Sequence, residues 1–135
     1  MIYLTTADIL TVIHQEELDE LTTGTGVDLD LIEANAIGEM SGYLNIRYDL
    51  AKCFDANPKI PIITKTLVDI VLYDAHAAIM PDNIPTLRET RYKNAIGWLE
   101  KTADGFIAPM LPAKDVDPKT PLRYGNSATK ENRYY

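Results

Sequence analysis

Residues 28–49 constrain the fold most, because they are the longest segment that reads as one amphipathic helix. Asp28 stands at the N-cap position, where its carboxylate can accept the free amide hydrogens of the first turn. Asp30 and Glu33 add negative charge at the positive end of the helix dipole. Apolar residues then recur at steps of three and four, which predicts roughly five turns buried along one side. The stripe consists of Leu29, Ile32, Ala36, Met40, Tyr43 and Arg47, widened by Ile37, Leu44 and Tyr48.

Two glycines, Gly38 and Gly42, interrupt this segment. In a helix interior each costs about 1 kcal/mol relative to alanine. We take them to indicate a close helix crossing or a bend. Glycines tolerated on an exposed face are the alternative.

Two short helices are expected before this segment. Residues 5–13 form one, capped by Thr5 or Thr6, and residues 16–21 form another turn. The glycine-rich loop 23–26 ends the second and leads into the cap at Asp28. Glycines followed by alternating carboxylates can also indicate a calcium loop, but a helix-capping loop explains the same residues. The side chains expected to face the core are Ile9, Leu10, Ile13, Leu18 and Leu21.

Two further helices follow an irregular stretch at 50–61. Pro61 suits the first turn of a helix that reaches about Ala78, and apolar residues cover most of its circumference, so this helix should be central. The last helix is capped by Thr86 or Asn83, reaches Ala103 and stops at Gly105. Its expected inward residues are Tyr92, Ala95, Ile96 and Leu99, and its basic side carries Arg88, Arg91 and Lys93.

These patterns predict an all-α fold: a small helical bundle built on two long helices plus short N-terminal helices, with an extended C-terminal tail. A chain of 135 residues is long enough for one core. We divide it into a helical domain, residues 1–108, and an extended or disordered C-terminal arm, residues 109–135, which has too few apolar residues for a core. The single cysteine, Cys53, cannot form an internal disulfide.

Charge separates the two parts of the chain. Residues 1–46 contain nine Asp and Glu and no Lys or Arg, and the whole of residues 1–108 has a balance of −9, whereas residues 109–135 have a balance of +2. The acidic surface would repel nucleic acid. Opposite charges on arm and body favour pairing of one copy's arm with another copy's body.

No apolar run approaches the length of about 20 residues that a membrane-spanning helix needs. The N-terminus also lacks the basic and apolar regions of a signal peptide. We therefore expect a soluble intracellular protein with no membrane partner.

Further candidates for chemistry are polar residues on the central helix and the two histidines. Asp69 and Asp74 are five residues apart and share a helix face poorly, so we interpret them as a polar edge that faces solvent or a neighbouring subunit. His14 and His76 are not at metal-ligand spacing and are read as structural. The sequence therefore predicts no catalytic, cofactor or metal site, and no enzyme.

The candidate interface residues lie on the last helix and in the arm. Trp98 is about 60 to 80 degrees from the centre of its helix's apolar stripe, so it sits at an edge or interface, with a core position as the alternative. Aromatic and apolar residues in a basic arm can dock into a partner's groove. The arm residues concerned are Leu122, Tyr124, Arg133, Tyr134 and Tyr135.

Several short motifs, in order, resemble the Mu-like prophage head-tail connector family of tailed phages over roughly residues 2–108. The motifs are Tyr-Leu-Thr-x-x-Asp at 3–8, Glu-Glu-Leu-x-x-Leu-Thr at 16–22, Gly-Tyr-Leu at 42–44 followed by Arg47, Tyr48 and Leu50, and Tyr92, Ala95, Trp98 and Leu99 in the last helix.

The resemblance implies a virion structural protein, a connector or adaptor that assembles as a homo-oligomeric ring beneath the portal protein and supports tail attachment. Its partners would be the portal and tail-completion proteins, and DNA would pass through the ring without specific binding. Its location would be the virion and, during assembly, the cytoplasm of the bacterial host. Two other classes stay open: a small helical regulator that binds a protein partner, and a helix-bundle enzyme that gathers Asp69, Asp74 or His76 in a pocket.

Overall fold

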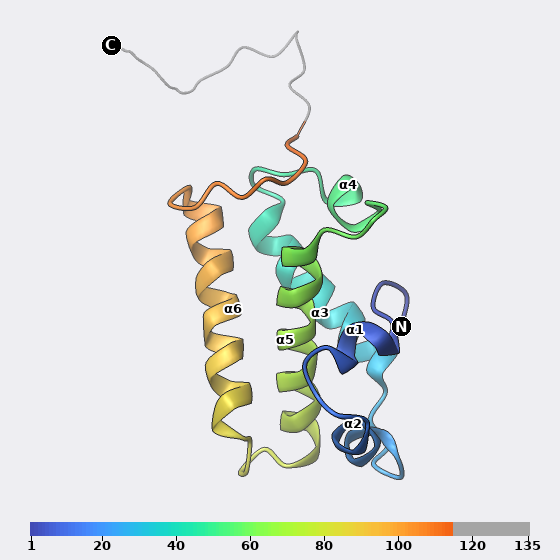
Figure 1. Ribbon diagram of the computed structural model, residues 1–135. Helices are drawn as coiled ribbons and strands as arrows, with labels where there is room; N and C mark the ends of the chain where they lie inside the picture. Colours follow the sequence, from blue (N-terminus) through green and yellow to red (C-terminus); the bar gives the residue numbers. More distant parts are fainter. Residues whose placement is uncertain (115–135) are drawn as a thin grey trace, which may run out of the picture.

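The computed structural model describes residues 1–114, and this part of the chain is all-α, as predicted (Figure 1). Three long helices form the body, and α5 packs against both α3 and α6. The short α1 and α2 pack against α5 as well. The helices are α1 (Thr6–Leu10), α2 (Gln15–Thr22), α3 (Leu29–Leu44), α4 (Leu50–Phe54), α5 (Pro61–Ile79) and α6 (Thr86–Asp104).

The predicted central helix is confirmed as α5. It begins at Pro61, whose missing amide hydrogen costs nothing in the first turn. Its aliphatic side chains are buried from Ile63 to Ala75, and they meet buried residues of every other long helix. The fully buried side chains of this core include Ile9, Met40, Leu44, Ile63, Leu67, Ile70, Leu72 and Leu99.

The helix predicted over residues 28–49 is too long, because α3 ends at Leu44. Asp49 accepts a hydrogen bond from the Lys52 amide and caps α4, a helix that the sequence analysis did not predict. A residue that caps the next helix has extended backbone and cannot continue the previous one. The predicted inward position of Arg47 is therefore wrong, whereas Leu44 is fully buried.

The glycines of α3 lie on its exposed side. A methyl group added at Gly38 or Gly42 would meet no atom within 4 Å. The close helix crossing inferred from these glycines is therefore wrong within this chain, and the alternative of an exposed face is confirmed.

The N-terminal helices largely follow the prediction. Thr5 caps α1 in a reciprocal pair with Asp8, and Leu18 and Leu21 of α2 are buried. Leu10 is exposed, so its predicted inward position is wrong. The loop before α3 is a capping loop, since Asp28 accepts a hydrogen bond from the Asp30 amide at 3.0 Å.

The predicted stop of α6 is confirmed, and its predicted N-cap is wrong. Pro85 occupies the N-cap without a side-chain hydrogen bond, so neither Thr86 nor Asn83 is the cap. At the other end Gly105 adopts a left-handed conformation, φ 88°, as predicted for a helix stop. Arg88, placed on the basic side in the prediction, is buried, and Trp98 is half-buried against the core.

Residues 106–114, here called the strap, cross the end of the bundle where α3 and α6 finish (Figure 1). Leu111 joins the core, the Asp49 amide donates to the Pro112 carbonyl oxygen at 2.9 Å, and the Lys114 amide donates to the Arg47 carbonyl oxygen at 3.4 Å. The first residues of the predicted arm thus lie against the body. Within residues 1–114, no helix has the length and apolarity that a bilayer span requires.

Candidate protein-binding site

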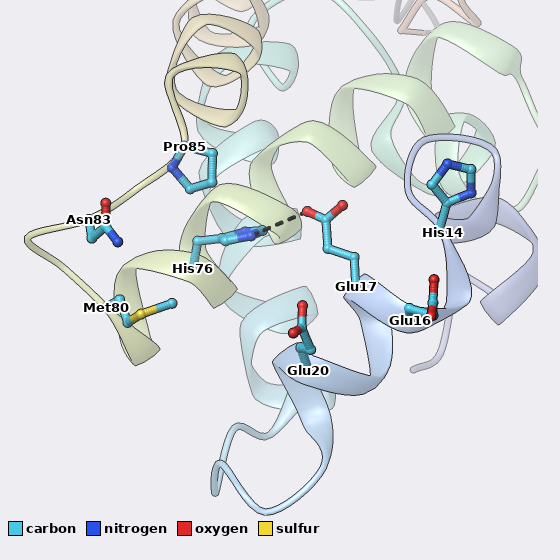
Figure 2. Close-up of a pocket in the computed structure, with 8 residues that line it drawn as sticks. All are labelled: His14, Glu16, Glu17, Glu20, His76, Met80, Asn83 and Pro85. Carbon is cyan, nitrogen blue, oxygen red and sulfur yellow. Dashed lines mark ion pairs between the residues drawn. The ribbon is translucent and has the colours of Figure 1, made fainter.

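A hollow of about 460 Å³ opens between α2, the C-terminal end of α5 and the α5–α6 loop (Figure 2). An adjoining hollow of about 360 Å³ shares four of its residues and adds the apolar Leu21 and Ile79. We call the two together the α2 hollow. Its lining consists of His14, Glu16, Glu17, Glu20, Leu21, His76, Ile79, Met80, Asn83 and Pro85.

The helical period of α2 explains the acidic rim of the hollow. Leu18 and Leu21 face the core, so Glu17 and Glu20, three residues apart, lie along the edge beside them. Within residues 1–114, neither Glu16 nor Glu20 has a hydrogen-bond or ion-pair partner. These two carboxylates therefore leave negative charge at the mouth of the hollow.

The third carboxylate, that of Glu17, lies beside His76. Its Nδ1 donates to the Leu72 carbonyl oxygen at 2.8 Å, and its Nε2 lies 3.5 Å from Glu17 Oε2, the contact drawn in Figure 2. The imidazole is buried and its orientation is fixed by α5. Because Nδ1 carries the proton donated to Leu72, Nε2 can donate to the Glu17 carboxylate only when the ring is protonated. The interpretation of His76 as structural fits this contact.

Arg88 lies in the same neighbourhood but is buried. Burial lowers the pKa of its guanidinium, and the charge of Arg91 lowers it further, whereas Glu17 and Asp69 act in the opposite direction. In the part of the chain that is described, its Nη1 has no hydrogen-bond partner. Electrostatic attraction to Glu17 and Asp69 offsets part of the cost of this buried charge.

Asp69 is buried rather than exposed at a polar edge, so that prediction is wrong. Arg91 Nε donates to its Oδ1 at 2.9 Å, and Lys65 Nζ donates to its Oδ2 at 3.3 Å. A cation from α6 and one from α5 thus satisfy the two oxygens of one carboxylate. Asp69 therefore links the two helices, and each of its oxygens accepts a hydrogen bond.

Asp74 has different surroundings. It is half-buried near Glu39 of α3, and burial together with the Glu39 charge raises its pKa to about 6. Tyr92 of α6 donates to Glu39 Oε2 at 3.3 Å and stacks on Tyr73, with ring centroids 4.1 Å apart. Asp69, Asp74 and His76 therefore contact three different sets of residues, and of the three, His76 lines the α2 hollow.

The raised pKa of Asp74 gives a pH-dependent prediction. Between its ordinary value of 3.8 and about 6, the folded protein keeps a proton that the unfolded chain releases, so stability is lost as pH rises through this window. Asp74→Asn should therefore raise the free energy of unfolding by about 1 kcal/mol at pH 7, a figure reduced because the group is partly exposed. At pH 4 the substitution should change the free energy of unfolding little.

Urea denaturation at the two pH values measures this difference. Asp82→Asn, in the exposed α5–α6 loop, is the control and should change stability little at either pH. Destabilisation by Asp74→Asn at pH 7, or an equal effect at both pH values, would contradict the assignment.

The remaining predicted site residues are placed as follows. Trp98 lies on α6 and packs against the core, and its predicted interface role stays a prediction. Leu122, Tyr124, Arg133, Tyr134 and Tyr135 lie outside the described residues. Within residues 1–114, no three His, Cys, Asp or Glu side chains gather in a way that could hold a metal ion.

Large apolar side chains are exposed at both ends of the bundle. Phe106 and Met110 of the strap are 85% and 99% exposed, and Met80 and Leu87, beside the α5–α6 loop at the other end, are 50% and 59% exposed. Ile2, Leu10, Leu31 and Ile46 are exposed as well, and a contiguous apolar patch, rather than single exposed residues, marks a surface that binds other proteins. Periodicity alone does not show which apolar residues lie beyond the core, so the sequence pattern does not predict these exposed side chains.

Comparison with protein families gives a match over most of the chain. The family model described as "Bacteriophage Mu, Gp36" matches residues 3–124. Neither the curated proteins nor the solved structures give a match.

Proposed function

The chain belongs to the bacteriophage Mu Gp36 family, and on this premise we propose that it is a virion structural protein that acts as a head-tail connector. In this role, copies of the chain form a ring beneath the portal protein, and tail-completion proteins bind the ring. The observation that carries the proposal is the family match, which extends over nearly the whole chain.

The two exposed apolar ends of the bundle support this role. A connector has to bind one component above it and another below it, and so it needs contact surfaces at opposite ends. The strap supplies Phe106 and Met110 at one end, and Met80 and Leu87 lie at the other.

The acidic N-terminal surface suits a ring that DNA passes through. Residues 1–46 contain no Lys or Arg, and Asp28 and Asp30 at the start of α3 are exposed. A wall that repels phosphate groups lets DNA move without sticking. We propose that part of this surface faces the channel.

Deletion of the coding sequence from a phage that carries it tests the proposal. We expect DNA-filled heads and separate tails in the lysate, with normal amounts of capsid and tail proteins, and restoration of tailed particles by the full chain supplied from a plasmid. A regulator would instead change the amounts of those proteins. Infectious tailed particles in the deletion strain would contradict the connector role.

A further inference from the structure

We infer that the α2 hollow binds the basic C-terminal segment, residues 119–135, of a second copy of this chain. The inference rests on the proposed function, because it takes the copies to assemble with one another. It goes further by naming the surface and the segment that meet.

Charge complementarity is the first argument. The segment contains Lys119, Arg123, Lys130 and Arg133 against Glu131 alone, a side-chain balance of +3. The hollow carries Glu16, Glu17 and Glu20 on its rim and has no Lys or Arg in its lining. Complementary charges of this kind guide the encounter and select the partner.

The apolar lining of the hollow is the second argument. Leu21, Ile79 and Met80 form an apolar wall beside the acidic rim. The segment places a tyrosine directly after an arginine twice, as Arg-Tyr at 123–124 and at 133–134. An aromatic ring can pack on methionine and aliphatic side chains, while the preceding guanidinium reaches a carboxylate of the rim.

Two other hollows fit this segment less well. One, of about 440 Å³, carries Lys59, Lys65 and Arg91 against Asp8, so its net positive charge repels a basic segment. The other, of about 650 Å³ between α3 and α6, has Lys101 beside Glu100 and Asp104 on its rim. The α2 hollow thus combines the apolar wall with a rim that carries only negative charge.

Chain length bears on whether the segment comes from a second copy or from the same chain. The strap places Lys114 at the end of the bundle opposite the α2 hollow (Figure 1). The distance between the two ends is about the length of α5, which is about 28 Å at 1.5 Å per residue. Nine residues beyond Lys114, a fully extended chain reaches only about 32 Å, so Arg123 could reach its own hollow only if it ran straight along the bundle. Arg133 lies ten residues further along and could reach its own hollow or that of a second copy, so the choice of a second copy rests on the assembly of copies and is decided by the cross-linking experiment below. A contact from one end of a copy to the other end of the next can repeat around a ring.

Charge reversal in the full chain tests the inference. Glu16→Lys/Glu20→Lys and, separately, Lys130→Glu/Arg133→Glu should each weaken self-association about tenfold at low salt, as measured by sedimentation. Mixing the two variants should restore association, because each hollow then meets a segment of opposite charge. Glu16 and Glu20 are exposed on α2, so these substitutions leave the core unchanged.

Glu100→Lys/Asp104→Lys, on the rim of the hollow between α3 and α6, is the matched control and should leave association unchanged. A larger loss from this control than from the α2 pair, a failure of the mixture to associate, or a wild-type chain that stays monomeric would each overturn the inference.

Disulfide trapping separates a second copy from the chain's own segment. Glu20→Cys and Tyr135→Cys, carried on differently tagged chains, should cross-link when the chains are mixed, and buried Cys53 should not compete. A cross-link that forms only when both cysteines are on one chain would overturn the inference. The deletion experiment does not depend on this contact, so the two proposals can fail separately. Tailless heads without a cross-link would refute the docking site alone. A cross-link together with normal tailed particles would refute the connector role alone.

Discussion

Asp69→Ala is expected to lower the free energy of unfolding by about 3 kcal/mol. The Asp69 side chain is buried, and its two oxygens accept hydrogen bonds from Arg91 and Lys65. The substitution leaves Arg91 without its carboxylate partner and removes a negative charge beside buried Arg88. Urea denaturation at pH 7 measures the loss, which corresponds to a melting temperature lower by roughly 10 °C.

Lys65→Ala is the matched control for this prediction. Lys65 contacts the same carboxylate but is mostly exposed, and an ion pair with an exposed partner contributes no more than about 1 kcal/mol. Equal losses for the two variants, or an Asp69→Ala protein as stable as the wild type, would show that the buried network does not join α5 to α6 in this way.

Glu33→Ala is expected to cost about 2 to 3 kcal/mol and to release the N-terminal segment from α3. The Glu33 carboxylate is 1% exposed and accepts three backbone hydrogen bonds, from Ile2 at 2.6 Å, Tyr3 at 3.2 Å and Leu4 at 2.6 Å. Without it these amides lose their acceptor, and the buried Tyr3 and Leu4 lose the anchor that holds them in the core. Hydrogen exchange should show lost protection at these amides, and urea denaturation should show the lower stability.

Asp30→Asn is the control, because Asp30 contacts the N-terminal amino group but is largely exposed. It should change stability little and leave the three amides protected. Retained protection of the amides in Glu33→Ala would contradict the role assigned to the carboxylate.

The parts of the fold that sequence could predict are those set by local chemistry. Pro61 marks the start of α5, the aliphatic residues that follow make it central, Thr5 caps α1, and Gly105 ends α6. Each signal acts within a few residues of its own position. The end of α3 was predicted wrongly because the apolar stripe continues to Tyr48, whereas Asp49 starts a new helix.

The buried charges could not be predicted in the same way. Asp69 can be buried because Arg91, on another helix, donates a hydrogen bond to its carboxylate. Glu33 can be buried because backbone amides of the N-terminal segment donate hydrogen bonds to its carboxylate. Partners distant in sequence leave no periodic signal. Glu33 did offer one clue, since it lies three residues before Ala36 and seven before Met40, on the line that faces the core.

The candidate site was predictable only in part. The acidic character of α2 and the inward positions of Leu18 and Leu21 were read from the sequence. The hollow itself depends on α2 packing beside the end of α5, where His76 meets Glu17. That contact joins residues far apart in the chain, so no local pattern indicates it.

Electron microscopy of the purified full chain mixed with the portal protein of the same phage tests the central claim most directly. We expect a closed ring of copies seated beneath the portal, and we expect that a chain ending at Lys114, which lacks the basic segment, fails to form it. A full-length chain that stays separate from the portal, or a truncated chain that forms the same ring, would contradict this account.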